Sequence, residues 1–353
     1  MTDNYDVIVV GGGPGGATAA KCCARSGFRV LLLEKGARGR HKSCGGVLPL
    51  VAPDIIEQIV QSSIPPDVMS DPPQLGLTYI PPSGRINGGR LTGYTVHNID
   101  RDKFDMWMVD LARDAGAEVL FSTRFTSLRQ DDGISVRVES KGRHTSFRTR
   151  FLIGADGVRS TVRKCLFPDL RSSVMVVGQE AWYGTGDFSN DFYGLFKGSI
   201  SPAYSYVIPK DGRLIIGTGI LPKSEPSVAD ALRLLRTWLE EEFVFVGTRL
   251  VGRERGAIPF GKIVHGKGNA VLVGDAAGLC NPLSGEGIRL AVESSEVASI
   301  SIEKHFDDKR VLDEYVRGTS DLSAMVRELH EFVVNANDAT REEFVRIELT
   351  RRR

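Results

Sequence analysis

The sequence lacks an excess of charge of either sign and lacks any long hydrophobic run. Its 45 Lys and Arg residues nearly balance 44 Asp and Glu residues, and the formal net charge is +1. No overall field therefore points to nucleic acid or to a membrane surface as a partner. No apolar run approaches the roughly 20 residues that span a bilayer. The first residues lead directly into a strand-like run, so we expect no removable signal peptide.

Cysteine is scarce and follows no pattern. The five cysteines form no C-x-x-C pair and no metal-ligand spacing: Cys22, Cys23, Cys44, Cys165 and Cys280. We therefore expect no metal site, reduced thiols and a cytoplasmic location. With 41% hydrophobic and 25% charged residues in 353, the chain can bury a large core, and its length predicts two domains.

A glycine-rich turn between two apolar runs is the most informative segment. Residues 5–16 read YDVIVVGGGPGG, and the next apolar run, FRVLLLE, ends at Glu34. Gly11 permits a tight turn, Gly13 permits close approach of a pyrophosphate, and Gly16 permits close packing of helix and strand. The helix that follows offers free N–H groups to an anion. Glu34 stands at about the distance, roughly 20 residues, expected of an acid that binds a ribose hydroxyl. The pattern predicts a dinucleotide-binding βαβ unit.

Two distant segments extend this pattern. GADGVRS (154–160) follows the apolar run RTRFLI, and NAVLVGDAAGLCNPLSGEG (269–287) ends a further run at Asp275. Both place an acid at the carboxyl end of a strand, which is where open α/β sheets bind ligands. Each segment alone is equally typical of a turn with an Asp cap, and we expect Asp156 to shape its turn rather than perform chemistry. Together and in this order, the three segments predict a cofactor with both phosphate and polyol groups.

This trio resembles the FAD-binding fold of the p-hydroxybenzoate hydroxylase type over roughly the first 300 residues. Within that fold the chain is similar to the geranylgeranyl reductase family, which includes the archaeal digeranylgeranylglycerophospholipid reductases. Three segments carry the narrower resemblance: KSCGGVLP (42–49), IDRDKFDMWMVDLARDAGAEV (99–119) and YSYVIPKDG (204–212). The last departs from the family element at two positions, with Tyr206 where a Trp is usual and Ile208 where an aromatic residue is usual.

The resemblance implies FAD as the cofactor and a set of residues around it. The family pattern places glycines at the pyrophosphate, acids at the ribose and ribityl hydroxyls, a loop beside the isoalloxazine and a helix N-terminus at the flavin N1–O2 edge. The residues implied to bind the cofactor are Gly11, Gly13, Gly15, Gly16, Glu34, Lys35, Cys44, Gly45, Val47, Arg101, Phe125, Asp275, Gly285, Gly287 and Ile288. A helix N-terminus there would stabilise the negative charge of reduced flavin.

Some of these positions have alternative interpretations. Arg101 could instead be a solvated arginine in the first turn of a helix. Cys44 is our candidate catalytic acid, yet a small buried thiol without chemistry fits its surroundings equally well. Tyr204 and Tyr206 alternate along a predicted strand and share one face, so they could line an apolar substrate pocket or simply pack in a core.

The expected fold class is α/β: a Rossmann-like FAD-binding domain with an inserted substrate domain of mainly antiparallel sheet. We assign residues 1–170 and 266–353, with C-terminal helices, to the FAD domain and 171–265 to the insert, to which part of 51–98 could contribute. Proline-rich breaks in 51–98 predict short elements there. Asp100 is predicted to cap a helix that ends at Gly116. The turn KDG (210–212) predicts a hairpin, and 228–243 an amphipathic helix.

The predicted activity is reduction of carbon–carbon double bonds in a prenyl chain, which would place the protein in isoprenoid lipid metabolism. Hydride would leave the flavin, while Cys44 or a water protonates the other carbon. The electron donor stays open among NAD(P)H, a ferredoxin-like protein and a quinol, since no second dinucleotide motif is present. A prenyl-lipid substrate would imply peripheral membrane contact. Two alternatives remain. The first is an oxygen-using monooxygenase or halogenase, because YSYVIP also resembles the Trp-x-Trp-x-Ile-Pro element of the halogenases. The second is a flavin electron carrier or redox sensor.

Overall fold

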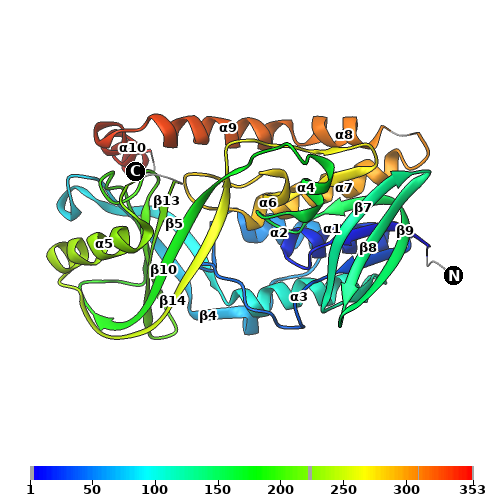
Figure 1. Ribbon diagram of the computed structural model, residues 1–353. Helices are drawn as coiled ribbons and strands as arrows, with labels where there is room; N and C mark the ends of the chain where they lie inside the picture. The colour runs from blue at the N-terminus through cyan, green and yellow to red at the C-terminus, as the bar shows by residue number, and fades with distance from the viewer. Residues whose placement is uncertain (1–3, 222–224, 309, 352–353) are drawn as a thin grey trace.

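The computed structural model describes residues 4–221, 225–308 and 310–351. Within these residues two eight-stranded sheets lie at opposite ends of an elongated molecule, and helices connect and cover them (Figure 1). We call them the first and the second sheet. The mixed architecture confirms the predicted α/β fold class.

The first sheet contains the strands that carry all three glycine motifs. Its strands are β1 (Asn4–Val10), β2 (Val30–Leu33), β6 (Glu118–Leu120), β7 (Thr123–Asp131), β8 (Gly133–Ser140), β9 (Arg143–Gly154), β15 (Gly266–Lys267) and β16 (Ala270–Leu272). The order β16-β9-β1-β2-β6 is parallel throughout, whereas β7 and β8 extend β9 in antiparallel fashion.

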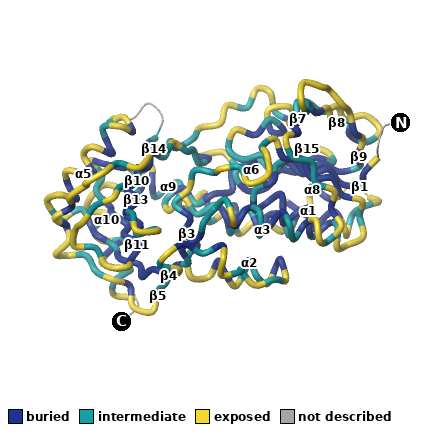
Figure 2. Tube along the Cα trace, turned by 90° about the horizontal axis from the view of Figure 1, so that it is seen from below, coloured by how far each residue is buried: buried dark blue, intermediate teal, exposed yellow. Residues whose placement is uncertain are grey.

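The parallel strands are buried on both faces, which explains their unbroken apolar runs. Val7 and Val9 of β1 face a core shared with helices, whereas Ile8 and Val10 face a second core shared with β7 and β8. Figure 2 shows these strands as the buried centre of one half of the molecule. Their tight burial gives the cofactor motifs a rigid base.

The second sheet is mainly antiparallel. Its strands, in the order β14-β10-β13-β12-β11-β4-β5-β3, are β3 (Val47–Leu48), β4 (Met69–Ile80), β5 (Gly89–Ile99), β10 (Ser173–Thr185), β11 (Asp191–Leu195), β12 (Ser205–Lys210), β13 (Arg213–Ile220) and β14 (Val246–Phe260). Strands β4 and β11 pair in parallel. Two stretches far apart in sequence therefore build one sheet.

The prediction of short elements in residues 51–98 was wrong. This stretch holds two of the longer strands, β4 and β5, besides a helix. Pro72 and Pro73 do not end β4, because the β4–β5 ladder is interrupted between Met69 and Gln74. At such an irregularity the missing proline N–H groups cost no ladder hydrogen bond.

The helices are α1 (Pro14–Arg25), α2 (Ala52–Val60), α3 (Arg101–Asp114), α4 (Thr161–Leu166), α5 (Val228–Phe243), α6 (Gly274–Ala277), α7 (Ile288–Lys304), α8 (Val311–Gly318), α9 (Ser320–Asn335) and α10 (Asp338–Thr350), with the 3-10 turns η1 (Pro66–Val68) and η2 (Arg85–Asn87). Helix α1 packs against α3 and α7 on the first sheet. Helix α9 runs along the molecule from α8, near the first sheet, to α10, which packs on β4 and β5 of the second (Figure 1).

Three local predictions are confirmed. The Asp100 side chain caps α3 by accepting hydrogen bonds from the backbone N–H groups of Asp102 and Lys103. The hairpin β12–β13 turns at Asp211 and Gly212, which both have positive φ, as a two-residue hairpin turn of this twist requires. Helix α5 covers the predicted range and buries its apolar face against β10 and β13.

Candidate functional site

The three glycine motifs meet at one edge of the first sheet. Register pairs Val10 at the end of β1 with Leu33 of β2 and with Gly154 of β9. The chain segments that leave these strands stay hydrogen-bonded to one another: Gly11 N–H donates to Leu33 O (2.7 Å), and Val273 N–H donates to Gly154 O (3.0 Å). Parallel strands thus bring residues separated by more than a hundred positions to one carboxyl edge, where such sheets bind ligands.

The first turn has the close contacts that its glycines predict. Gly11 has φ +110°, and a Cβ added to Gly16 would lie only 1.8 Å from Gly11 O. Gly13 differs, because the nearest heavy atom to a Cβ added there is Arg40 Nη2, at 3.7 Å. Gly13 is the N-cap residue of α1, and no side chain caps this helix start. The tight pair holds the turn together, and the open side at Gly13 leaves the start of α1 accessible to an anion.

Glu34 lies buried beside this turn. Its Oε2 accepts a hydrogen bond from Gly12 N–H, and its Oε1 accepts one from Gly36 N–H, both at 2.7 Å. Arg40 pairs with it, Nε to Oε1 at 3.3 Å. The sequence interpretation missed Arg40, since it lies in a basic, glycine-rich loop without periodicity. Arg40 therefore adds a cation between the acid and the open face of Gly13.

The two other motifs interlock through a buried arginine. Arg163 of α4 donates from Nη1 to the backbone oxygens of Asp275 (3.2 Å) and Ala276 (2.8 Å). Asp156 Oδ2 accepts from Thr161 N–H, as expected of a residue that shapes its turn. Its Oδ1 is buried and has no hydrogen-bond partner among the described residues. An unsatisfied acceptor at this edge fits a cofactor that carries hydroxyl donors.

Asp275 lies at the start of the last motif, next to α7. A Cβ added to Gly287 would lie 3.2 Å from Asp275 Oδ1. Burial raises the pKa of the Asp275 carboxyl, while the cations of Lys42, Arg101 and Arg163 oppose that shift. Gly287 is the N-cap of α7 and Ile288 is its first residue, so the predicted helix start is confirmed. The carboxylate and the helix N-terminus face the same region.

The loop 42–46 lies between α3 and the second sheet. Cys44 is exposed, and its Sγ accepts a hydrogen bond from Gly46 N–H (3.4 Å). Arg101 is not the solvated arginine of the alternative interpretation: its side chain is 9% exposed, and Nη2 donates to Asp105 Oδ1 at 2.9 Å. Although burial lowers the pKa of Arg101, Asp105 and the Cys44 sulfur raise it above its ordinary value. A buried, charged guanidinium thus lies beside the thiol.

Tyr204 and Tyr206 face this loop from the second sheet. Their rings contact edge to face at 6.3 Å, and the Phe192 ring stacks on Tyr206 at 6.2 Å. Tyr204 Oη donates to Ser284 O of the third motif (2.8 Å), and a Cβ added to Gly45 would lie 4.0 Å from the Tyr206 ring. Burial raises the pKa of both tyrosines. The aromatic face therefore lies opposite the two loops predicted to hold the flavin ring.

The other predicted residues have less distinctive surroundings. Lys35 is exposed, Gly15 packs against α7, and Val47 pairs with Asn98 in the second sheet. Phe125 is 5% exposed and packs in the core between the β7–β8 hairpin and the parallel strands of the first sheet. Its predicted contact with the cofactor, like the other individual contacts, stays a prediction.

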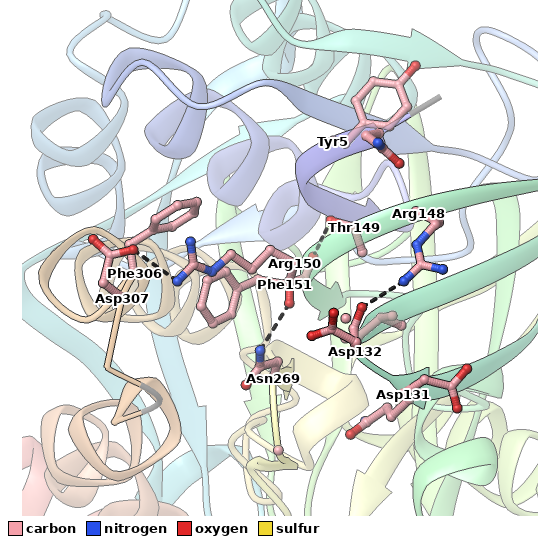
Figure 3. Close-up of a pocket in the computed structure, with 15 residues that line it drawn as sticks. Tyr5, Asp131, Asp132, Arg148, Thr149, Arg150, Phe151, Asn269, Phe306 and Asp307 are labelled. Atoms are coloured by element: carbon pink, nitrogen blue, oxygen red, sulfur yellow. Dashed lines mark hydrogen bonds and ion pairs between the residues drawn. The ribbon is translucent and has the colours of Figure 1, made fainter. Parts of the chain in front are cut away.

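A groove of about 560 Å³ lies elsewhere, at the amino-terminal edge of the first sheet. Figure 3 shows its wall, where Arg150 pairs with Asp307 and Asn269 donates to the Arg150 carbonyl. Tyr5, at the start of β1, also lines it. The cofactor motifs leave the opposite, carboxyl ends of these strands, so the groove is separate from the candidate site.

Among residues 4–221, 225–308 and 310–351, no three His, Cys, Asp or Glu side chains are grouped so as to hold a metal ion. No helix in the part of the chain that the structure describes has both the length and the apolar character needed to cross a membrane.

Comparison with known proteins agrees with this geometry. Residues 4–192, more than half of the chain, match the FAD binding domain family. The chain belongs to this family. Its cofactor is FAD, which the glycine turn, the buried acids and the unsatisfied Asp156 oxygen fit, and it is a FAD-dependent oxidoreductase. It is also similar to protein CbrA of Escherichia coli (strain K12), with 30% identity over 309 residues that cover 84% of this chain and 83% of the relative.

Solved structures share the whole fold. A geranylgeranyl bacteriochlorophyll reductase-like protein from Thermoplasma acidophilum matches with TM-score 0.81 at 21% identity, covering 99% of this chain and 92% of its own. The p-nitrophenol 4-monooxygenase PnpA from Pseudomonas putida DLL-E4 matches with TM-score 0.73 at 18% identity, covering 99% and 95%. At these sequence identities the matches establish the fold alone. They confirm that the fold is of the predicted p-hydroxybenzoate hydroxylase type.

Proposed function

We propose that this flavoenzyme reduces carbon–carbon double bonds of a prenyl chain of the geranylgeranyl type. The observation that carries the proposal is the apolar aromatic face of Tyr204, Tyr206 and Phe192 opposite a loop that presents a thiol, Cys44. An isolated carbon–carbon double bond has no polar group to hydrogen-bond, so its recognition depends on apolar protein surface. Its reduction also needs a proton donor beside the flavin. The fold shared with the reductase-like protein from Thermoplasma acidophilum adds support.

The residues would divide the work as follows. When bound, reduced FAD supplies the hydride. Gly13 and the start of α1 would bind the pyrophosphate, Glu34 and Asp275 would bind cofactor hydroxyls, and the start of α7 would stabilise negative charge on the ring. Cys44 would give its proton to the other carbon of the double bond, and solvent would restore the thiol. The aromatic face would orient the chain and exclude water.

We also propose that the second sheet with α5 is the substrate domain. Residues 171–265 supply most of its strands, and 51–98 supply β4 and most of β5. The rest of residues 1–170, together with 266–353, would form the FAD domain with its C-terminal helices. An electron donor, whether NAD(P)H, a ferredoxin-like protein or a quinol, would restore the reduced flavin, and a lipid substrate would bring the protein to a membrane surface.

An anaerobic half-reaction tests the activity directly. The flavin-loaded protein is reduced with dithionite, the excess is removed, and a geranylgeranyl lipid is added while the visible flavin absorbance is followed. The fully saturated lipid of the same length serves as the control ligand, and Cys44→Ser serves as the variant with the donor atom changed. The proposal expects reoxidation only with the unsaturated lipid, a hydrogenated product by mass spectrometry, and a slower reaction in Cys44→Ser.

Two outcomes would contradict the proposal. Flavin that stays reduced with every prenyl lipid until air enters, and then yields a hydroxylated or halogenated aromatic compound, would favour the oxygen-using alternative. Flavin that passes electrons only to oxygen and dyes would favour an electron carrier or sensor.

A further inference from the structure

Lys210 lies where the second sheet meets the cofactor loop. It is the last residue of β12, at the hairpin turn. Its Nζ donates to Ile99 O at 2.8 Å and to Gly46 O at 3.2 Å. The first carbonyl precedes the Asp100 cap of α3, and the second belongs to the loop that carries Cys44. One ammonium group therefore ties three chain segments together.

The contact with Gly46 bears directly on the thiol. Gly46 has φ +67°, and a Cβ added to it would lie 2.3 Å from Ile99 O and 2.5 Å from Lys210 Nζ. The same residue donates its N–H to Cys44 Sγ. Lys210 thus holds the carbonyl of the peptide unit that follows Gly46, and the backbone of Gly46 in turn orients the sulfur.

The charges around Lys210 also bear on the thiol. Burial lowers the pKa of Lys210 to about 8; Cys44, Asp211 and Asp100 oppose this shift, and Arg101 adds to it. Arg101 in turn interacts with both Asp105 and Cys44. Lys210 and Arg101 therefore both interact with Cys44.

We propose that Lys210 is a positioning residue for Cys44: its ammonium group holds the Gly46 turn, and the backbone N–H of that turn orients the sulfur. This inference rests on the proposed function for its catalytic meaning. There Cys44 gives a proton to a substrate carbon, becomes a thiolate, and takes a proton from solvent to regain the thiol. The coupling between Lys210 and Cys44 can be measured without any substrate.

The experiment follows alkylation of Cys44 by iodoacetamide, resolved by mass spectrometry, in flavin-loaded Cys165→Ser protein. That background removes the other exposed thiol. Lys210→Met removes the charge, and Lys210→Arg keeps it. Lys197→Met is the matched control, because Lys197 Nζ also donates to a carbonyl, Pro82 O, at the second sheet. Flavin content is measured in every variant.

The expected result is alkylation about fivefold faster in Lys210→Met, because the Gly46 turn that holds the sulfur loses a hydrogen bond worth about 1 kcal/mol and opens more often. Lys210→Arg and Lys197→Met should react like the parent protein. Equal rates in Lys210→Met and the parent would overturn the inference. If Lys210→Met fails to retain flavin, the pH profile decides. The parent should show an inflection near the pKa of Lys210, about 8, that Lys210→Arg lacks, and identical profiles would refute the coupling.

The half-reaction with lipid gives an independent result. Failure of the parent protein to reduce any prenyl lipid would refute the proposed function, whereas the alkylation rates would still show whether Lys210 controls the thiol.

Discussion

Alanine substitutions at two glycines of the first turn, Gly13 and Gly16, should distinguish an effect on folding stability from an effect on FAD binding. A Cβ at Gly16 would lie 1.8 Å from Gly11 O, and the contact must lengthen beyond 3.0 Å, below which such contacts essentially do not occur. Since a backbone oxygen cannot move aside, Gly16→Ala should cost about 1–3 kcal/mol or more of folding stability, as overpacking does. It should also lower flavin content.

Gly13→Ala should behave in the opposite way. Gly13 has φ −86°, which alanine adopts freely, and its Cβ would meet only Arg40 Nη2 at 3.7 Å. The free energy of unfolding of flavin-free protein should therefore change by no more than about 0.5 kcal/mol. FAD affinity should fall at least tenfold, about 1.4 kcal/mol, because the methyl group enters the space through which a pyrophosphate approaches the start of α1.

The assay measures both quantities in the same preparations. Flavin is stripped, unfolding is followed with and without added FAD, and the dissociation constant is obtained from flavin fluorescence. Stability gained on adding FAD reports the affinity independently, because a ligand that binds only the folded state stabilises it. A Gly13→Ala protein that binds FAD as tightly as the parent would refute the placement of the pyrophosphate. A Gly16→Ala protein of unchanged stability would refute the packing of the turn.

Three further variants follow. Asp275→Ala should purify with less flavin than Asp275→Asn, and full occupancy in the alanine variant would contradict its assigned contact. The hydrogen bond to Asp102 raises the pKa of His41. Protonated His41 therefore contributes fully to folding stability below the pKa of histidine in the unfolded chain, about 6.5. This contribution is lost as pH rises through the higher pKa of the folded state. His41→Gln should abolish this part of the pH dependence of the free energy of unfolding. Tyr206→Phe leaves Gln179 Oε1 without its donor and should cost about 1 kcal/mol of stability at unchanged flavin content; an unchanged unfolding midpoint would exclude that bond.

Prediction from sequence succeeded where the signal lies within a few residues. The cap at Asp100, the turn at Asp211 and Gly212, and the glycine turn after β1 each depend on local backbone preferences. Prediction failed for β4, since two prolines locally indicate a break. Only the interrupted ladder with β5 shows that those residues need no pairing there. Pairing between strands is a property of the sheet, and the residues of one strand do not encode it alone.

The sequence by itself determined the cofactor class, because binding a pyrophosphate at the start of a helix demands glycines at fixed spacing after a buried strand. Tertiary structure decided which other side chains reach the site. Arg40 lies beside Gly13, and Lys210 holds the turn at Gly46, yet no local pattern in the sequence predicts either contact. Lys210 reaches Gly46 across 164 positions of sequence. A single charged residue acquires such partners only when distant segments of the chain pack together, since burial and distance, rather than residue type, set the strength of each contact.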